Sequence, residues 1–146
     1  MTTTKANARW EGNLKEGSGE MRLPSGTYSG PYTFRSRFET GASTEEGTNP
    51  EELVGAALAG CYSMYLANIL DKAGYTPDHV DAEVSVQLDV TDAGPVISKS
   101  VMLVRVKAPG LDDETLQAKA QEAARDCPVS KALSSVEKSV NASLVS

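Results

Sequence analysis

The chain has 146 residues, of which 40% are apolar and 23% are charged, and its formal net charge is −6. This length predicts one domain over residues 1–146 with a single hydrophobic core, and the composition is that of a globular protein. The acidic balance argues against a nucleic-acid partner or an anionic membrane surface, because no basic stripe is available to contact phosphates. The N-terminal residues lack the apolar segment of a secretory signal, so the cytoplasm is the expected location. A lasting structural disulfide is not expected in that compartment.

The first forty residues are predicted to form strands. Turn signals divide them at Gly17–Gly19, Pro24–Gly26 and Gly30–Pro31. The last strand, YTFRSRFE at residues 32–39, alternates between one face with three aromatic residues and a second face that is polar and charged. Arg35 and Arg37 share that second face. A polar loop at residues 40–48 follows.

A long helix is predicted to begin at Asn49-Pro50 and to run to about Ala73. Asparagine is a preferred N-cap, proline suits the first helical position, and two glutamates then lie against the positive end of the helix dipole. Gly74 provides the C-terminal stop. The stretch 53–70 is the one candidate membrane span, but glycines, alanines and polar residues dilute it. A central helix that is buried on most sides explains it better, so no membrane partner is expected.

The second half of the chain is predicted to contain a hairpin, a helix and a final strand. The hairpin pairs residues 80–90, whose valines, Ala82 and Leu88 point inward, with residues 96–108 around a turn at residues 92–95. The second helix begins at residues 112–114 and ends near Cys127-Pro128, where a short helical turn precedes the last strand. Strands interrupted by helices without regular alternation predict an α+β fold with a mainly antiparallel sheet.

The spacing of metal-binding residue types excludes the common metal centres. Two cysteines 66 residues apart and one loop histidine, His79, do not form a zinc site. The glycines near position 55 are not followed by the lysine and serine or threonine of a phosphate loop. We therefore expect no metal and no cofactor.

Cysteine chemistry is the reactive possibility that is left. Cys61 lies inside the long helix, and the simplest interpretation is that it is a small core residue. Three observations favour a reactive role. Tyr62, Met64 and Tyr65 could form an apolar wall around its sulfur. Cys127 precedes a short helix that begins at Pro128, a position expected to lower the pKa of a mobile thiol. Finally, a charged set, Arg37 with Glu51 and Glu52, could favour a thiolate.

Helix geometry limits how these groups can meet. Glu51 and Cys61 are ten residues apart, or about 15 Å along a helix axis, so they cannot meet on one helix. If both serve one site, Glu51 must come from a second, antiparallel copy of the helix at a two-fold axis. The alternative is that Glu51 only stabilises the start of its own helix.

The segments GTNPEELVGAALAGCYSM, CPVSKAL and RFE together resemble the osmotically inducible protein C (OsmC) family, which is related to the organic hydroperoxide resistance (Ohr) proteins. The resemblance implies an intertwined α+β homodimer with long central helices at the interface. It also implies roles for four residues: Cys61 as the peroxidatic thiolate, Cys127 as the resolving thiol, and Arg37 with Glu51 as the activating polar pair.

The resemblance implies thiol-based reduction of organic hydroperoxides, and more weakly of hydrogen peroxide, in oxidative or osmotic stress defence. Cys61 would form a sulfenic acid, Cys127 would convert it to a Cys61–Cys127 disulfide, and an external dithiol would reduce that disulfide. Two alternatives stay open. One is a non-catalytic dimer that binds an apolar small molecule, and the other is a redox sensor.

Overall fold

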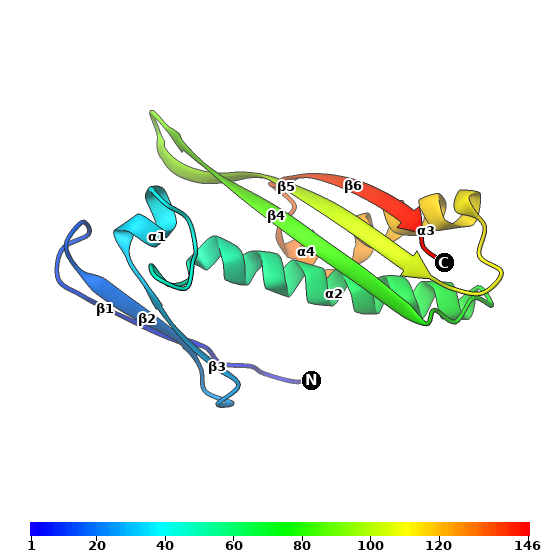
Figure 1. Ribbon diagram of the computed structural model, residues 1–146, viewed down its shortest axis with the longest axis horizontal. Coiled ribbons are helices and arrows are strands. Elements are labelled where there is room, and N and C mark those ends of the chain that lie inside the picture. Colours follow the sequence, from blue (N-terminus) through cyan, green and yellow to red (C-terminus); the bar gives the residue numbers. More distant parts are fainter. The chain divides into compact units, whose positions relative to one another are not determined.

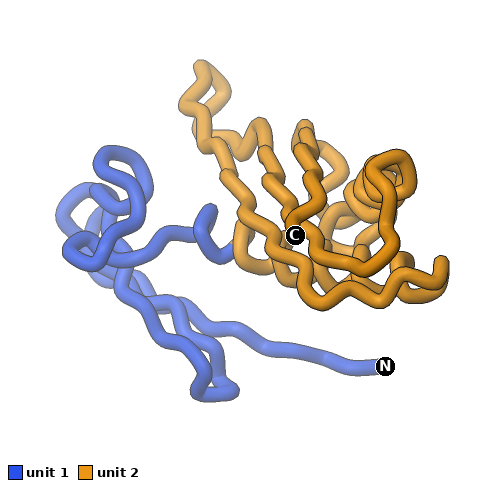
Figure 2. The backbone as a smooth tube through the Cα atoms, turned by 45° about the vertical axis from the view of Figure 1, so that its right-hand side comes forward, with its two compact units in different colours: residues 1–53 blue, residues 54–146 orange.

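The computed structural model describes residues 1–146, which form two compact units. Unit 1 comprises Met1–Leu53 and unit 2 comprises Val54–Ser146 (Figure 2). Each unit is an assembly of strands with at least one helix, and the whole is an α+β fold, as the sequence predicts. The division does not decide whether the chain is one domain, which stays a prediction.

Unit 1 is built on a three-stranded antiparallel sheet in the order β1-β2-β3. The strands are β1 (Asn7–Glu11), β2 (Ser18–Leu23) and β3 (Tyr28–Tyr32). The predicted turn at Pro24–Gly26 is confirmed, with Gly26 at φ +84°. The predicted turn at Gly30–Pro31 is wrong, because both residues lie inside β3. The edge position of β3 explains this, since an edge strand tolerates a proline that donates no hydrogen bond.

The predicted strand at residues 32–39 is also wrong, because a short helix, α1 (Phe34–Phe38), occupies its centre. Thr33 and Ser36 form a capping box: the Thr33 hydroxyl accepts from the Ser36 amide at 3.1 Å and Ser36 Oγ accepts from the Thr33 amide at 2.9 Å. The rings of Phe34 and Phe38 then meet one helical turn apart, with centroids 5.0 Å apart. This local capping outweighs the alternating pattern.

The long helix α2 (Pro50–Lys72) has the predicted limits. Asn49 Oδ1 accepts from the amide of Glu52 at 2.8 Å, which is the expected N-cap bond. Gly74 follows the last turn at φ +95°, in the left-handed region that glycine favours.

Unit 2 packs helices against one face of a three-stranded sheet (Figure 1). Strands β4 (His79–Thr91) and β5 (Gly94–Lys107) form the predicted antiparallel hairpin. Strand β6 (Glu137–Leu144) joins β5 in parallel. Two helices, α3 (Asp113–Asp126) and α4 (Pro128–Ala132), connect β5 to β6.

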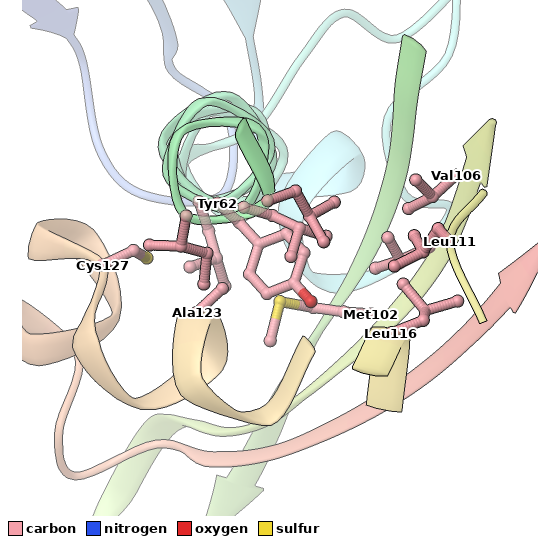
Figure 3. Packing of buried hydrophobic residues seen from close by; sticks show 12 residues of the cluster. Tyr62, Met102, Val106, Leu111, Leu116, Ala123 and Cys127 are labelled. Atoms are coloured by element: carbon pink, nitrogen blue, oxygen red, sulfur yellow. The ribbon is translucent and has the colours of Figure 1, made fainter. Parts of the chain in front are cut away.

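The core of unit 2 lies between this sheet and the helices. Alternate residues of β5 point into it, and α2 and α3 contribute the facing side chains (Figure 3). The largest fully buried side chains of the core are Leu58, Tyr62, Leu66, Leu70, Met102, Val104, Val106, Leu116 and Cys127. Val90, which the alternation places inward, is instead 75% exposed, because it lies beside the hairpin turn after an irregularity in the pairing at residues 87–88.

Helix α2 is long and apolar enough to cross a membrane by length and composition alone. Five of its residues lie in the core of unit 2, which is the environment of a core helix. Only a third of its most apolar stretch is buried, however, so the prediction of burial on most sides is wrong for the single chain.

Candidate active site

The two cysteines lie in unit 2 and the structure brings them together. Both are free thiols: Cys61 is half-buried on α2, and Cys127 is fully buried between α3 and α4. Cys127 belongs to the core cluster, and Cys61 packs against that cluster. Cys61 is close enough to raise the pKa of Cys127.

Burial raises the pKa of Cys127, and the neighbouring Cys61 raises it further. Hydrogen bonds from the Ser130 backbone and side chain act in the opposite direction without cancelling the rise. The predicted lowering of this pKa by the helix start is therefore wrong, because loss of water outweighs the donors of a five-residue helix. The Cys127 side chain has no exposed surface in the single chain.

The predicted apolar wall of Tyr62, Met64 and Tyr65 around Cys61 does not form as one surface. Tyr62 is fully buried, and its hydroxyl donates to the Ala120 carbonyl of α3 at 3.0 Å. Burial and the charge of Cys127 raise the pKa of Tyr62. Met64 is 77% exposed on another side of α2. Tyr62 and Met64 are two residues apart and point in nearly opposite directions on a helix, so the three side chains do not line one pocket together.

The predicted polar pair lies in unit 1. Arg37 on α1 donates to one oxygen of Glu51, from Nη2 at 2.9 Å and from Nε at 3.2 Å. The Glu51 side chain is 7% exposed and that of Arg37 is 35% exposed. The second oxygen of Glu51, Oε2, is buried and has no hydrogen-bond partner. Glu52 is not part of the pair, because it accepts from the Thr48 hydroxyl instead.

The helical form of α1 separates the two arginines that the predicted strand placed on one face. Residues two apart on a helix point in nearly opposite directions. The exposed Arg35 is paired with the exposed Glu39 and the half-buried Glu46. Arg37 alone reaches Glu51, which supports Arg37 as the arginine of the pair.

Two buried polar residues position this pair: Ser36, which the sequence reasoning missed, and the predicted N-cap Asn49. Ser36 is fully buried, and its hydroxyl donates to the Thr48 carbonyl at 2.7 Å. The Asn49 side chain donates to the Ser36 carbonyl at 2.8 Å while it caps α2. These bonds join α1 to the start of α2 and hold Arg37 beside Glu51. The Thr33–Ser36 capping-box spacing was the signal that could have revealed the role of Ser36.

Glu51 and Cys61 both lie on the continuous helix α2, ten residues apart. That separation is about 15 Å along the axis, as expected from the sequence. The structure thus contains two groups of candidate residues, Arg37 with Glu51 in unit 1 and Cys61 with Cys127 in unit 2. No group of three or more histidine, cysteine or acidic residues has the arrangement of a metal site.

Comparisons with known proteins agree on one family. Residues 43–141 match the model of the family described as OsmC-like protein. The chain is 45% identical over 130 residues to Peroxiredoxin OsmC of Escherichia coli strain K12, covering 88% of each chain. It is 33% identical over 96 residues to an organic hydroperoxide resistance protein of Xanthomonas axonopodis pv. citri, covering 64% of this chain and 65% of that protein. The crystal structure of an OsmC-like protein from Mycoplasma pneumoniae has the same fold, with a TM-score of 0.70, 17% identity and 99% of each chain covered.

Proposed function

Because the chain belongs to the OsmC-like protein family, we propose that it is a thiol-dependent peroxidase. Its substrates are organic hydroperoxides and, more weakly, hydrogen peroxide, and its role is defence against oxidative and osmotic stress. The observation that carries the proposal is the pairing of a half-buried thiol, Cys61, with a second, fully buried thiol, Cys127. A protein that only binds an apolar ligand has no need of two adjacent thiols.

Cys61 is the peroxidatic residue of the proposed cycle. Its thiolate attacks the terminal oxygen of the hydroperoxide, so that an S–O bond forms and the O–O bond breaks. The alkoxide leaves and takes a proton to become the alcohol, and Cys61 is oxidised to a sulfenic acid. The half-buried position of Cys61 allows a small peroxide group to reach it.

Cys127 is the resolving residue. Its sulfur attacks the sulfenic sulfur, an S–S bond forms and water leaves. The high pKa of Cys127 keeps it protonated at neutral pH, and this limits its competition with Cys61 for peroxide. An external dithiol then reduces the Cys61–Cys127 disulfide by exchange and becomes a disulfide itself.

Arg37 and Glu51 activate and orient the peroxide in this proposal. The guanidinium favours the thiolate form of Cys61 and holds a peroxide oxygen. The unpartnered Oε2 of Glu51 is a buried acceptor, and such an atom is satisfied by a donor such as the O–H of a hydroperoxide. Arg37 in turn keeps the Glu51 carboxylate in place through Oε1.

The proposed site requires two chains. Glu51 is about 15 Å from Cys61 along α2, so the Arg37–Glu51 pair serves the Cys61 of a second copy. A symmetric homodimer in which α2 helices lie antiparallel provides this arrangement. The exposed face of α2 fits such a contact: it carries small and apolar residues, including Ala57, Gly60 and Met64, and a side chain at Gly60 would meet no neighbour within the chain. We place the enzyme in the cytoplasm, with no metal, cofactor, membrane or nucleic acid in its cycle.

The decisive experiment is dithiol-dependent consumption of cumene hydroperoxide by the wild type and two variants. Cys61→Ser should abolish consumption. Cys127→Ser should still react once, and its sulfenic acid should persist and be trapped by a dimedone-type probe. If Cys61→Ser consumes peroxide as fast as the wild type, the peroxidase proposal is wrong. Slow turnover together with a mixed disulfide to a second protein would favour the sensor alternative.

A further inference from the structure

Unit 1 contains a cavity of about 200 Å³ beside the proposed catalytic arginine. Its walls are mainly aromatic and come from the first strands, the loop after β1, and α1. The lining side chains that matter are Trp10, Leu14, Tyr32, Phe34, Arg37 and Phe38. All of them lie in one compact unit, so the cavity does not depend on how the two units are arranged.

Two aromatic pairs fix the shape of the cavity. The rings of Trp10 and Tyr32 have centroids 5.3 Å apart and planes tilted by 53°. The rings of Phe34 and Phe38 have centroids 5.0 Å apart and planes tilted by 39°. Tilted pairs at these separations are a favourable aromatic geometry, and their faces and edges suit another ring.

Arg37 gives this aromatic cavity a cationic border. The centre of its guanidinium lies 5.2 Å from the Phe38 ring centroid, within the range of a cation–π contact. Its two hydrogen bonds to Glu51 use Nε and Nη2. The Nη1 group is therefore available to a polar atom of a ligand whose apolar part occupies the cavity.

We propose that this cavity binds the aryl group of an aryl hydroperoxide and thereby selects the substrate of the proposed peroxidase. The volume supports one ring: a dry apolar cavity of about 150 Å³ holds benzene, so about 200 Å³ holds a phenyl group with a small substituent. With the ring in the cavity, the peroxide group lies toward Arg37, which is paired with Glu51. The inference rests on the proposed function and adds the substrate class.

Binding can be measured without turnover, because Trp10 is the only tryptophan of the chain and lines the cavity. The probe is 2-phenyl-2-propanol, the alcohol formed from cumene hydroperoxide, and tert-butanol is the matched probe without a ring. We expect a saturable change of Trp10 fluorescence with the aryl alcohol and none with tert-butanol. If both alcohols give the same non-saturating change, the cavity is not an aryl site.

Two variants test the cavity: one fills it, and the other removes part of its aromatic wall. Leu14→Phe adds volume at a side chain that is 60% exposed, so it should fill the cavity without disturbing a core. Phe34→Leu removes one aromatic wall. Tyr28→Leu is the control, because Tyr28 is an aromatic residue of β3 that does not line this cavity. Each of the first two variants should lower the ratio of kcat/KM for cumene hydroperoxide to that for tert-butyl hydroperoxide by about tenfold.

The outcomes separate this inference from the proposed function. If the wild type consumes both hydroperoxides and Cys61→Ser consumes neither, but the ratio is the same in Leu14→Phe and Phe34→Leu, then the peroxidase stands and the aryl site is wrong. If Leu14→Phe changes the oligomeric state and leaves the ratio unchanged, a second chain occupies the cavity and the aryl site is also wrong. Saturable binding of the aryl alcohol, lost in Leu14→Phe, supports the site even if the wild type consumes no peroxide.

Discussion

Arg37 donates both of its hydrogen bonds to the same carboxylate oxygen of Glu51, and the other oxygen of Glu51 is buried without a partner. The pair joins a five-residue helix to the first turn of the longest helix in the chain. A buried carboxylate with one strong partner depends on that partner more than the half-buried arginine depends on the carboxylate.

Removing Arg37 should lower the free energy of unfolding more than replacing Glu51 by glutamine. Arg37→Met leaves the Glu51 carboxylate buried and uncompensated, so we expect the free energy of unfolding to fall by about 1–3 kcal/mol. Glu51→Gln should cost less, because an amide oxygen can still accept from Arg37. Urea denaturation of both single variants and the double variant measures the coupling. Additive losses would contradict the proposed dependence of Glu51 on Arg37.

Ser36 should matter for stability although no step of the proposed reaction involves its hydroxyl. Ser36→Ala leaves the Thr33 amide and the Thr48 carbonyl without their present partner. We expect a loss of about 1–3 kcal/mol, the range for a buried group left unpaired. Ser25→Ala, which removes an exposed hydroxyl pair with Thr27, is the control and should change stability by less than about 0.5 kcal/mol. Equal losses in the two variants would show that the Ser36 bonds are unimportant.

The reduced protein should lose stability in alkaline solution. Burial raises the pKa of Cys127 above its ordinary value of 9.0 and that of Tyr62 above 10.0. The folded state then holds protons that the unfolded state releases, so the free energy of unfolding falls as the pH rises above about 9. The stabilising contribution of protonated Cys127 and Tyr62 is fully present below about pH 9. Urea denaturation at pH 7 and pH 10 with excess dithiothreitol measures the loss.

Variants assign this pH dependence to its groups. Cys127→Ala and Tyr62→Phe should each reduce the difference in stability between pH 7 and pH 10. Tyr28→Phe, at a half-buried tyrosine of unit 1, is the matched control and should leave the difference as in the wild type. If neither Cys127→Ala nor Tyr62→Phe reduces it, other groups are responsible.

The exposed face of α2 should control the oligomeric state. Met64 is 77% exposed in the single chain, on the face proposed to contact a second copy. Met64→Lys places a charge in that contact, so we expect the dimer dissociation constant to rise by about tenfold or more in sedimentation experiments. Leu144→Lys changes a less exposed apolar residue at the end of β6 and should leave the dimer intact. A wild-type protein that sediments as a monomer would contradict the two-chain site.

The limits of α2 could be predicted because their signals are local. Asn49, Pro50 and Gly74 act within one helical turn of the ends they define, and each does so in the structure. The hairpin of β4 and β5 could be predicted for a similar reason, since its strands are joined by a short turn. Helix α1 was missed because five residues give too short a window to distinguish a helix from a strand by periodicity, and the capping box decided the outcome.

The sequence by itself determined the α+β class, the family, and the presence of two thiols with an arginine and a glutamate as the candidate reactive groups. Only the tertiary structure decided how those groups are placed. Packing of α3 against the sheet buries Cys127 beside Cys61 and raises its pKa, and the bonds around Ser36 bring Arg37 to Glu51. Burial and long-range contacts depend on which distant segments meet, whereas caps and turns depend on neighbours in the chain, so the sequence pattern could indicate the residues but not their environments.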